Sequence, residues 1–412
     1  MNVFLKNKRF RIEVINQFIS DIGEYLFNAV FVIYAANVYK SELAVSIASF
    51  IGMFPLVFQV IVGIMADSTN NKKKYIYSIG WIQALLFVGA YFIIGHNSLL
   101  SFAVLTLINL FSDVIGMYSD SLQYSYFNKI VPQEDITEAS LFSSVMYRIK
   151  SLVGPALGVF LLKISNNNYQ AITLINAITF MIYAILIRRV YYNLEDAKVL
   201  EKENLSMKLK EIMKNILNIY KNSNEDTGQA ITLLGTDIIL GCVGTAANYM
   251  LTVSFVENPF FNISFEDVHL VKGATMSILA ILSGLLAKDI FSRWSVSKIF
   301  NLNLLLIFLQ LILYAINTDI TKLIGWVIGL INFYTKIKVG PKITSALFEK
   351  VEESRVASVS SGLNFLQMGL LPIITGLMLA IYNISSILAW SVSIFIVVVN
   401  TIIFRRNIEI YE

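Results

Sequence analysis

The chain lacks most of the side chains that metal and redox chemistry requires. Its 412 residues include one cysteine, Cys242, and two histidines, His96 and His269. A single cysteine excludes an internal disulfide, a cysteine-based zinc site and an iron–sulfur cluster. The two histidines are far apart in the sequence, at what we expect to be the outer ends of helices. We therefore expect no metal site and no bound cofactor.

Charged residues are also scarce. Asp, Glu, Lys and Arg make up 15% of the chain, against about 25% in soluble domains, whereas hydrophobic residues make up 56%. No stretch is long and polar enough for a nucleotide-binding domain, and we find no Gly-rich phosphate loop or nucleophile–base pair. The net charge of +4 does not indicate binding to nucleic acid. The composition indicates an integral membrane protein that is not an enzyme, surrounded by the lipid bilayer.

Apolar runs recur along the chain at the length that crosses a bilayer, which is about twenty residues for an α-helix. They predict an all-α membrane protein with twelve transmembrane helices. The first run is too long for a signal peptide and has no small-residue cleavage site, so we expect it to be retained. The predicted spans are 12–38, 43–66, 75–95, 99–123, 139–163, 169–187, 229–256, 268–291, 297–315, 321–347, 358–382 and 385–404.

Basic residues gather in the loops on one side of these spans. The positive-inside rule places that side, and with it both termini, in the cytoplasm. An even number of spans agrees with this orientation. A composition rich in Asn and Ile, with Lys favoured over Arg, suggests a bacterium, and hence a bacterial cytoplasmic membrane. The basic loops include residues 6–11, 72–74, 188–189, 208–214 and 405–406.

A polar stretch divides the chain into two halves. We expect an N-terminal six-helix bundle at 1–192, a cytoplasmic linker at 193–227 and a C-terminal six-helix bundle at 228–412. Within the linker, residues 206–220 place apolar side chains on one helical face and lysines on another. This pattern is typical of a helix lying on a membrane surface. The helix either couples the two halves or is a surface linker.

The two halves also share a turn. Gly284 to Lys298 follows the eighth predicted span as Gly63 to Lys74 follows the second, and both turns have a small residue, an acid and late basic residues. Two six-helix halves with such a repeat are typical of a transporter whose substrate site lies between them.

The first of these turns reads GIMADSTNNKKK. We expect its glycine to let helices approach closely and its aspartate to bind a helix terminus or a basic side chain. The turn resembles the G-x-x-x-D-R-x-G-R-R loop of the major facilitator superfamily. Ser68 and Asn70 depart from that pattern, where the family has Arg and Gly. The residues that fit it are Gly63, Asp67, Lys72 and Lys73.

Further stretches resemble one branch of that superfamily, the exporters related to macrolide-efflux and enterobactin-efflux proteins. Gly154, Pro155 and Gly158 resemble the G-P-x-x-G core of a motif associated with exporters. Small residues four apart also favour close helix packing, so a packing seam with no role in transport direction is the alternative interpretation. The other matching stretches are Phe10-Arg11, Gly23-Glu24, Val131-Pro132-Gln133-Glu134 and Arg355-Val356.

The resemblance implies two pseudo-symmetric six-helix bundles around a central cavity that is lined by spans one, four, seven and ten. It also implies alternating access and export. The fourth span departs from many antiporters of the superfamily, because it contains Asp113 and Asp120 but no arginine. Proton-coupling schemes that use that arginine therefore cannot be transferred to this chain.

Several charged residues fall at membrane depth, where each costs roughly 2.5–3.5 kcal/mol and marks a functional candidate. A buried carboxylate without a full partner can take up a proton, as a proton antiporter requires. We expect Glu24 to couple to protons first, followed by Asp21, Asp113 and Asp237, and we expect Asp113 to pair with a base of span five. Alternatively, a buried pair of an acid and a base has only a structural role and holds two helices together. The bases at this depth are Arg148, Lys150, Lys336 and Lys338.

These observations predict a monomeric secondary transporter that uses the proton gradient to export a small amphipathic molecule. The mixed charges favour an antibiotic, a peptide or a siderophore-like compound, and multidrug resistance is the corresponding biological role. Two alternatives remain open. One is a nutrient importer of the same fold, and the other is a non-transporting immunity or sensing protein built on it.

Overall fold

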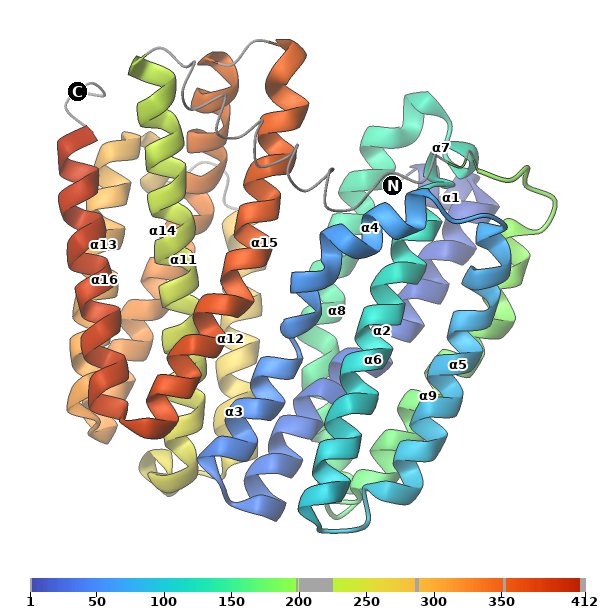
Figure 1. Cartoon of the computed structure of the whole chain (residues 1–412), viewed down its shortest axis with the longest axis horizontal. Coiled ribbons are helices and arrows are strands. Elements are labelled where there is room, and N and C mark those ends of the chain that lie inside the picture. Colours follow the sequence, from blue (N-terminus) through green and yellow to red (C-terminus); the bar gives the residue numbers. More distant parts are fainter. Residues whose placement is uncertain (1, 198, 200–224, 286–288, 351–352, 408–412) are drawn as a thin grey trace. The chain divides into compact units, whose positions relative to one another are not determined.

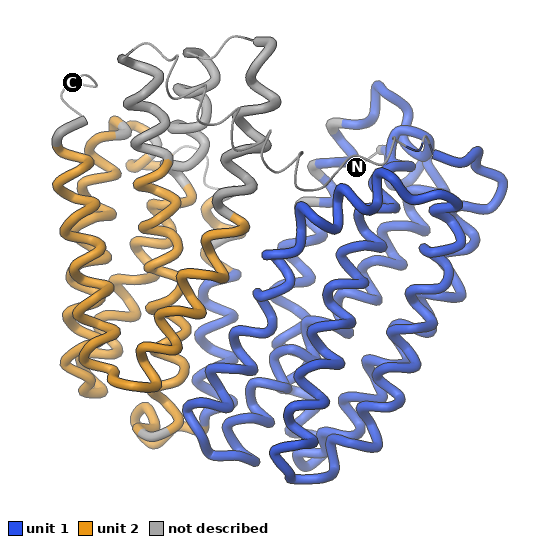
Figure 2. Tube along the Cα trace, viewed as in Figure 1, with its two compact units in different colours: residues 1–203, 265–277 blue, residues 204–264, 278–412 orange. Residues whose placement is uncertain are grey.

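The computed structural model describes residues 2–197, 199, 225–285, 289–350 and 353–407. All regular structure in these ranges is helical (Figure 1). The chain divides into two compact units, shown in Figure 2. Unit 1 contains residues 1–203 and 265–277, and unit 2 contains residues 204–264 and 278–412. The expected linker helix at 206–220 lies outside the described residues.

The long helices of unit 1 coincide with the first six predicted spans. A π-helical turn, Ala35–Tyr39, extends the first of them. Two short helices, α1 (Asn2–Lys6) and α7 (Phe127–Ile130), lie outside the spans. The long helices are α2 (Lys8–Tyr34), α3 (Glu42–Ile51) with α4 (Gln59–Asp67), α5 (Lys72–Ile93), α6 (Leu99–Tyr124), α8 (Ile136–Ile164) and α9 (Tyr169–Tyr191).

The helices that follow coincide with the last six predicted spans. The first part of α12, residues 265–277, is grouped with unit 1. The six helices are α11 (Glu225–Glu257), α12 (Phe265–Leu285), α13 (Val296–Ile316), α14 (Asp319–Lys350), α15 (Glu353–Ile384) and α16 (Ser386–Asn407).

The second predicted span is not one continuous helix. Helices α3 and α4 meet at a bend of 40°, and a short 3-10 turn, Phe54–Phe58, joins them. Pro55 lies in that turn, where its missing N–H and its ring interrupt the helical hydrogen bonds. The span predicted at 43–66 is therefore formed by two helices joined at a bend.

Among the described residues, eight helices are long and apolar enough to cross a membrane, or nine when α3 and α4 count as one broken span. Helices α12, α14 and α15 occupy the positions of three further predicted spans. Several helices begin at polar side chains that accept a hydrogen bond from the first turn. These N-cap residues are Asn7, Ser41, Ser98, Asn168 and Ser295.

Helix α2 lies at the centre of unit 1, because it packs along both α8 and α9. Its aromatic side chains Phe27 and Phe31 are buried, and they contact Phe87 of α5 and Phe102 of α6. This packing holds the helices that carry the polar residues described next.

Candidate functional site

A pocket of about 60 Å³ lies inside unit 1. One water molecule needs ~10–15 Å³ of such space, so the pocket has room for several waters. It is too small for a drug-sized ligand, which occupies roughly 300–1,000 Å³. Helices α2, α5, α6 and α9 supply its lining: Gln17, Ser20, Asp21, Glu24, Gln83, Asp113, Gly116, Met117, Ser119, Asp120 and Tyr183.

Helical spacing explains why these polar residues share one pocket. On α2, residues 17, 20, 21 and 24 recur every three or four positions, so they lie on one face of the helix. On α6, residues 113, 116, 117 and 120 repeat the same spacing. Gln83 of α5 donates to the backbone oxygen of Ser112 at 3.1 Å, which ties α5 to α6 beside the pocket.

The pocket contains four carboxylates, and a lysine contacts one of them. The ammonium group of Lys150, on α8, contacts the carboxylate of Asp21. The Lys150 side chain is 9% exposed and that of Asp21 is 33% exposed. The sequence suggested that Lys150 or Arg148 pairs with Asp113, and this was wrong for Lys150. Arg148 is exposed and does not line the pocket.

Asp113 is buried, and its Oδ1 has no hydrogen-bond partner among the described residues. Glu24 interacts electrostatically with Asp113, Asp21 and Asp120 across the pocket. Burying several ionised carboxylates with one cation is unfavourable unless some of them are neutralised. The pocket is therefore suited to binding protons.

Asp120 was not among our predicted site residues, although the sequence contained a signal for it. It follows Asp113 by seven residues, which is two helical turns, so both carboxylates point to one side of α6. The depth argument selected only residues near the expected bilayer centre and left Asp120 out.

Two glycines bring α8 against α2. A Cβ atom at Gly154 would lie 2.5 Å from the Cβ of Tyr25, and one at Gly158 would lie 2.7 Å from the backbone oxygen of Leu26. Only glycine permits this approach. Lys150 lies one turn before Gly154, and Asp21 lies one turn before Tyr25, so the same contact brings the lysine to the aspartate. Pro155 lies between the glycines, inside α8.

Unit 2 contains a smaller charged site. The ammonium nitrogen of Lys336, on α14, lies 3.8 Å from Oδ1 of Asp237, on α11, and donates to the backbone oxygen of Asp237 at 2.9 Å. Gly241, one turn further along α11, leaves room for the lysine, since a Cβ there would lie 2.1 Å from Nζ. The side chain of Lys338 lies outside the described residues.

Lys72, the first residue of α5, caps the end of α4. Its side chain is buried, and Nζ donates to the backbone oxygens of Ala66 at 2.6 Å and Asp67 at 3.2 Å. These are among the last carbonyls of α4, which have no partner within the helix. A Cβ at Gly63 would meet no atom of the described residues within 4 Å, so the close helix approach expected there is not seen among them.

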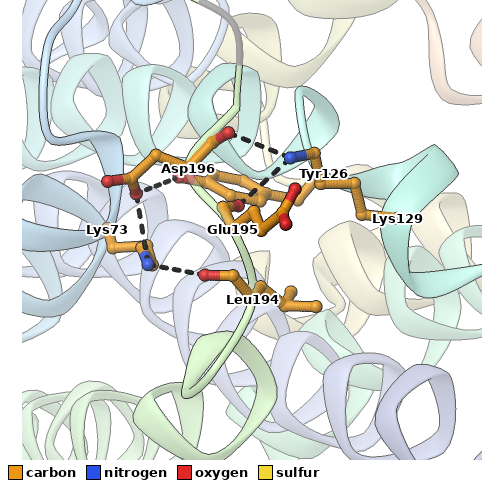
Figure 3. Close-up of polar contacts among 6 residues, drawn as sticks. All are labelled: Lys73, Tyr126, Lys129, Leu194, Glu195 and Asp196. Carbon is orange, nitrogen blue, oxygen red and sulfur yellow. Dashed lines mark hydrogen bonds and ion pairs between the residues drawn. The ribbon is translucent and has the colours of Figure 1, made fainter.

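The next lysine holds the segment 194–196 that follows α9 (Figure 3). Nζ of Lys73 lies 3.2 Å from Oδ1 of Asp196 and donates to the backbone oxygen of Leu194 at 2.8 Å. Lys129 donates to two further carbonyls of this segment. Burial raises the pKa of Tyr126 to about 12, so its hydroxyl stays protonated and donates to Asp196. The sequence pattern did not predict these contacts.

Comparison with protein families identifies one match. The family model of the Major Facilitator Superfamily matches residues 14–336. No curated protein matches the chain.

Three solved structures with a similar fold are distant in sequence. A bacterial homologue of the iron transporter ferroportin in an inward-facing state has a TM-score of 0.70 at 11% identity, over 98% of this chain and 99% of that one. A peptide transporter POT in complex with sulfate has a TM-score of 0.67 at 14% identity, over 97% and 95%. The nucleoside transporter NupG has a TM-score of 0.62 at 15% identity, over 96% and 100%. At these identities the similarity concerns the fold.

Proposed function

The chain belongs to the Major Facilitator Superfamily, and we propose that it is a proton-coupled exporter of a small amphipathic molecule. Membership of this family makes it a multi-pass membrane transporter rather than an enzyme, with the all-α major facilitator fold expected from the sequence. The observation that carries the proposal is the pocket in unit 1, where four carboxylates share one lysine.

The net charge of the pocket changes when one of its carboxylates binds a proton. We assign Glu24 as the first proton-binding residue, because its carboxylate interacts with three other acids of the pocket. Asp113 and Asp21 follow, the first because one oxygen lacks a partner and the second because Lys150 already offsets its charge. A proton drives transport only if it binds the two conformations of the transporter with different affinity. Binding and release at Glu24 provide that difference.

The substrate binds elsewhere than this pocket. A volume of about 60 Å³ suits water and protons, whereas an antibiotic, a peptide or a siderophore-like compound needs several times more. Export rather than import rests on the resemblance of Gly154, Pro155 and Gly158 to the exporter motif. We further propose a monomer in a bacterial cytoplasmic membrane, with both termini in the cytoplasm and no bound cofactor.

The test is a proton-release assay in everted membrane vesicles. Internal pH is followed while antibiotics, short peptides and siderophore-like acids are added in turn. We expect at least one compound to release protons in the wild type and none to do so in Glu24→Gln. Glu195→Gln is the matched control, because Glu195 is exposed and lies outside the pocket.

Two outcomes would contradict the proposal. Unchanged proton release in Glu24→Gln would remove the coupling role from Glu24. Absence of any pH response, in vesicles where a control antiporter works, would favour the non-transporting interpretation. Reconstitution in both orientations separates export from import. A proton-coupled exporter moves its substrate in the direction opposite to the protons, whereas a proton-coupled importer moves it in the same direction.

A further inference from the structure

Glu13 is a buried carboxyl group that the pocket does not include. It lies on α2 and is 6% exposed, among apolar neighbours that include Phe10 and Val14. Its Oε1 accepts a hydrogen bond from the Tyr191 hydroxyl at 2.8 Å. Its Oε2 has no hydrogen-bond partner among the described residues. An ionised carboxylate so placed is poorly compensated, whereas a protonated one has a hydrogen to donate.

A continuous set of hydrogen bonds connects Glu13 to the pocket. The Tyr191 hydroxyl also lies 3.4 Å from Oε1 of Gln123, on α6. Nε2 of Gln123 donates to the Tyr183 hydroxyl at 2.9 Å, and it lies 3.4 Å from Oδ1 of Asp120. Tyr183 and Asp120 both line the pocket. Two side chains, Tyr191 and Gln123, therefore separate Glu13 from Asp120, one of the four carboxylates of the pocket.

The orientation of the Tyr191 hydroxyl depends on the charge of Glu13, and this couples Glu13 to the pocket. It has one hydrogen and two acceptors, the carboxyl oxygen of Glu13 and the amide oxygen of Gln123. When Glu13 is ionised, the hydrogen points to Glu13. When Glu13 is protonated, the acid can donate to the tyrosine oxygen, and the tyrosine hydrogen turns to Gln123. The amide then carries the change to Asp120 and Tyr183.

Charge connects the same residues through space. The described titratable groups that interact with Glu13 are Tyr191 and Tyr183 of α9 and Asp120 of α6. Glu13 and Asp120 are like charges when both are ionised, so a proton on one changes the binding of a proton to the other.

We propose that Glu13 is a further proton-binding residue of this transporter, outside the acidic pocket and linked to it through Tyr191 and Gln123. The proposal rests on the proposed proton-coupled function. Along α2, Glu13 lies about 7.5 Å from Lys8 at the beginning of the helix, and Glu24 lies about 24 Å from it. Glu13 therefore holds a proton between that end of the helix and the pocket.

Proton counting on the purified, full-length protein in lipid nanodiscs tests this proposal. The number of protons taken up on acidification is measured, and the infrared carbonyl band of protonated carboxyl groups is recorded with it. We expect Glu13→Gln to take up about one proton fewer than the wild type. Glutamine still accepts the Tyr191 hydrogen bond, so the thermal unfolding temperature should be unchanged. The infrared band of the pocket acids, identified by its loss in Glu24→Gln, should shift.

Tyr191→Phe tests the link itself and serves if Glu13→Gln does not fold. It removes the hydrogen bond that Tyr191 donates to the Glu13 side chain and the connection to Gln123, so one step of the proton titration should move to a different pH. Tyr314→Phe is the matched control, because Tyr314 accepts a hydrogen bond from Gln310 in unit 2, outside this network. It should leave the titration unchanged.

The outcomes separate the two proposals. A normal proton count in Glu13→Gln, together with a reduced count in Glu24→Gln, would overturn the role of Glu13 and leave the pocket in place. A titration of Tyr191→Phe identical to that of the wild type would overturn the link. A wild type that takes up no protons would overturn the proton-coupled function, and the role of Glu13 with it.

Discussion

The two units hold their membrane-embedded charges in different ways. In unit 1, four carboxylates share a pocket with one lysine. In unit 2, one described aspartate, Asp237, is matched by one lysine, Lys336. A matched pair gains little from a proton, because protonation of the acid leaves the base alone. Carboxylates that outnumber the bases around them can bind and release protons. Unit 1 is therefore the half that is suited to respond to a proton gradient.

In both units a glycine leaves room for an acid–base pair, but it lies on the helix of the base in unit 1 and on the helix of the acid in unit 2. In unit 1, Gly154 and Gly158 lie on α8, the helix of the base, and let the two backbones come together. In unit 2, Gly241 lies on α11, the helix of the acid, and makes room for the end of the lysine side chain. The pair in unit 1 therefore depends on helix packing, whereas the pair in unit 2 depends on local space.

The largest expected effect concerns that packing. We expect Gly158→Leu to destabilise the protein by about 3 kcal/mol or more, because the side chain would overlap the backbone of Leu26. Thermal unfolding in detergent measures the change. Gly89→Leu is the control, since a Cβ at Gly89 would meet no atom of the described residues within 4 Å. Equal stability of the two variants would show that glycine does not determine the α8–α2 contact.

A second prediction compares the two lysines. We expect Lys150→Met to lower substrate-driven proton release about tenfold, equal to about 1.4 kcal/mol. Without Lys150, the four acids of the pocket have no cation, and bound protons are retained. Lys336→Met should have a smaller effect, because only Asp237 loses its partner. The vesicle assay measures both variants. A greater loss in Lys336→Met would reverse the assignment of the coupling half.

The smallest effect is expected at the surface. Lys73 and Asp196 are 25% and 56% exposed, and exposed ion pairs contribute about 0–1 kcal/mol. We expect Lys73→Met to speed hydrogen exchange in residues 194–197, and the difference from wild type to shrink at high salt. Lys74→Met is the control, because the hydrogen bonds described for Lys74 use its backbone atoms and not its side chain. A change of unfolding temperature as large as that of Gly158→Leu would contradict this ranking.

The helices could be predicted well from hydrophobic runs, because a bilayer demands about twenty apolar residues per span. The all-α membrane fold was confirmed. The break at Pro55 was not predicted, since a proline inside an apolar run changes its mean hydropathy little. The signature turn was recognised from its residues, yet the partner of Lys73 is a carboxylate more than a hundred positions away. No spacing in the turn could predict that contact.

The candidate site was predicted only in part. Glu24, Asp21 and Asp113 were selected by their depth in the spans, and the structure places all three in one pocket. The partner of Lys150 was not predicted correctly, because α8 can turn its face to either α2 or α6. Tyr191 was also missed, since a tyrosine near a helix end is common at membrane interfaces.

The sequence by itself determined which residues are too polar for lipid and how deep each one lies. That follows from composition and helical rise, which are local properties of the chain. Only the tertiary structure decided which of these groups meet. Lys150 reaches Asp21 because Gly154 and Gly158 let two helices touch. Glu13 is linked to the pocket because Tyr191, on the helix α9 that packs along α2, also reaches Gln123 of α6. Contacts between helices depend on the shapes of both surfaces, and no single segment encodes them.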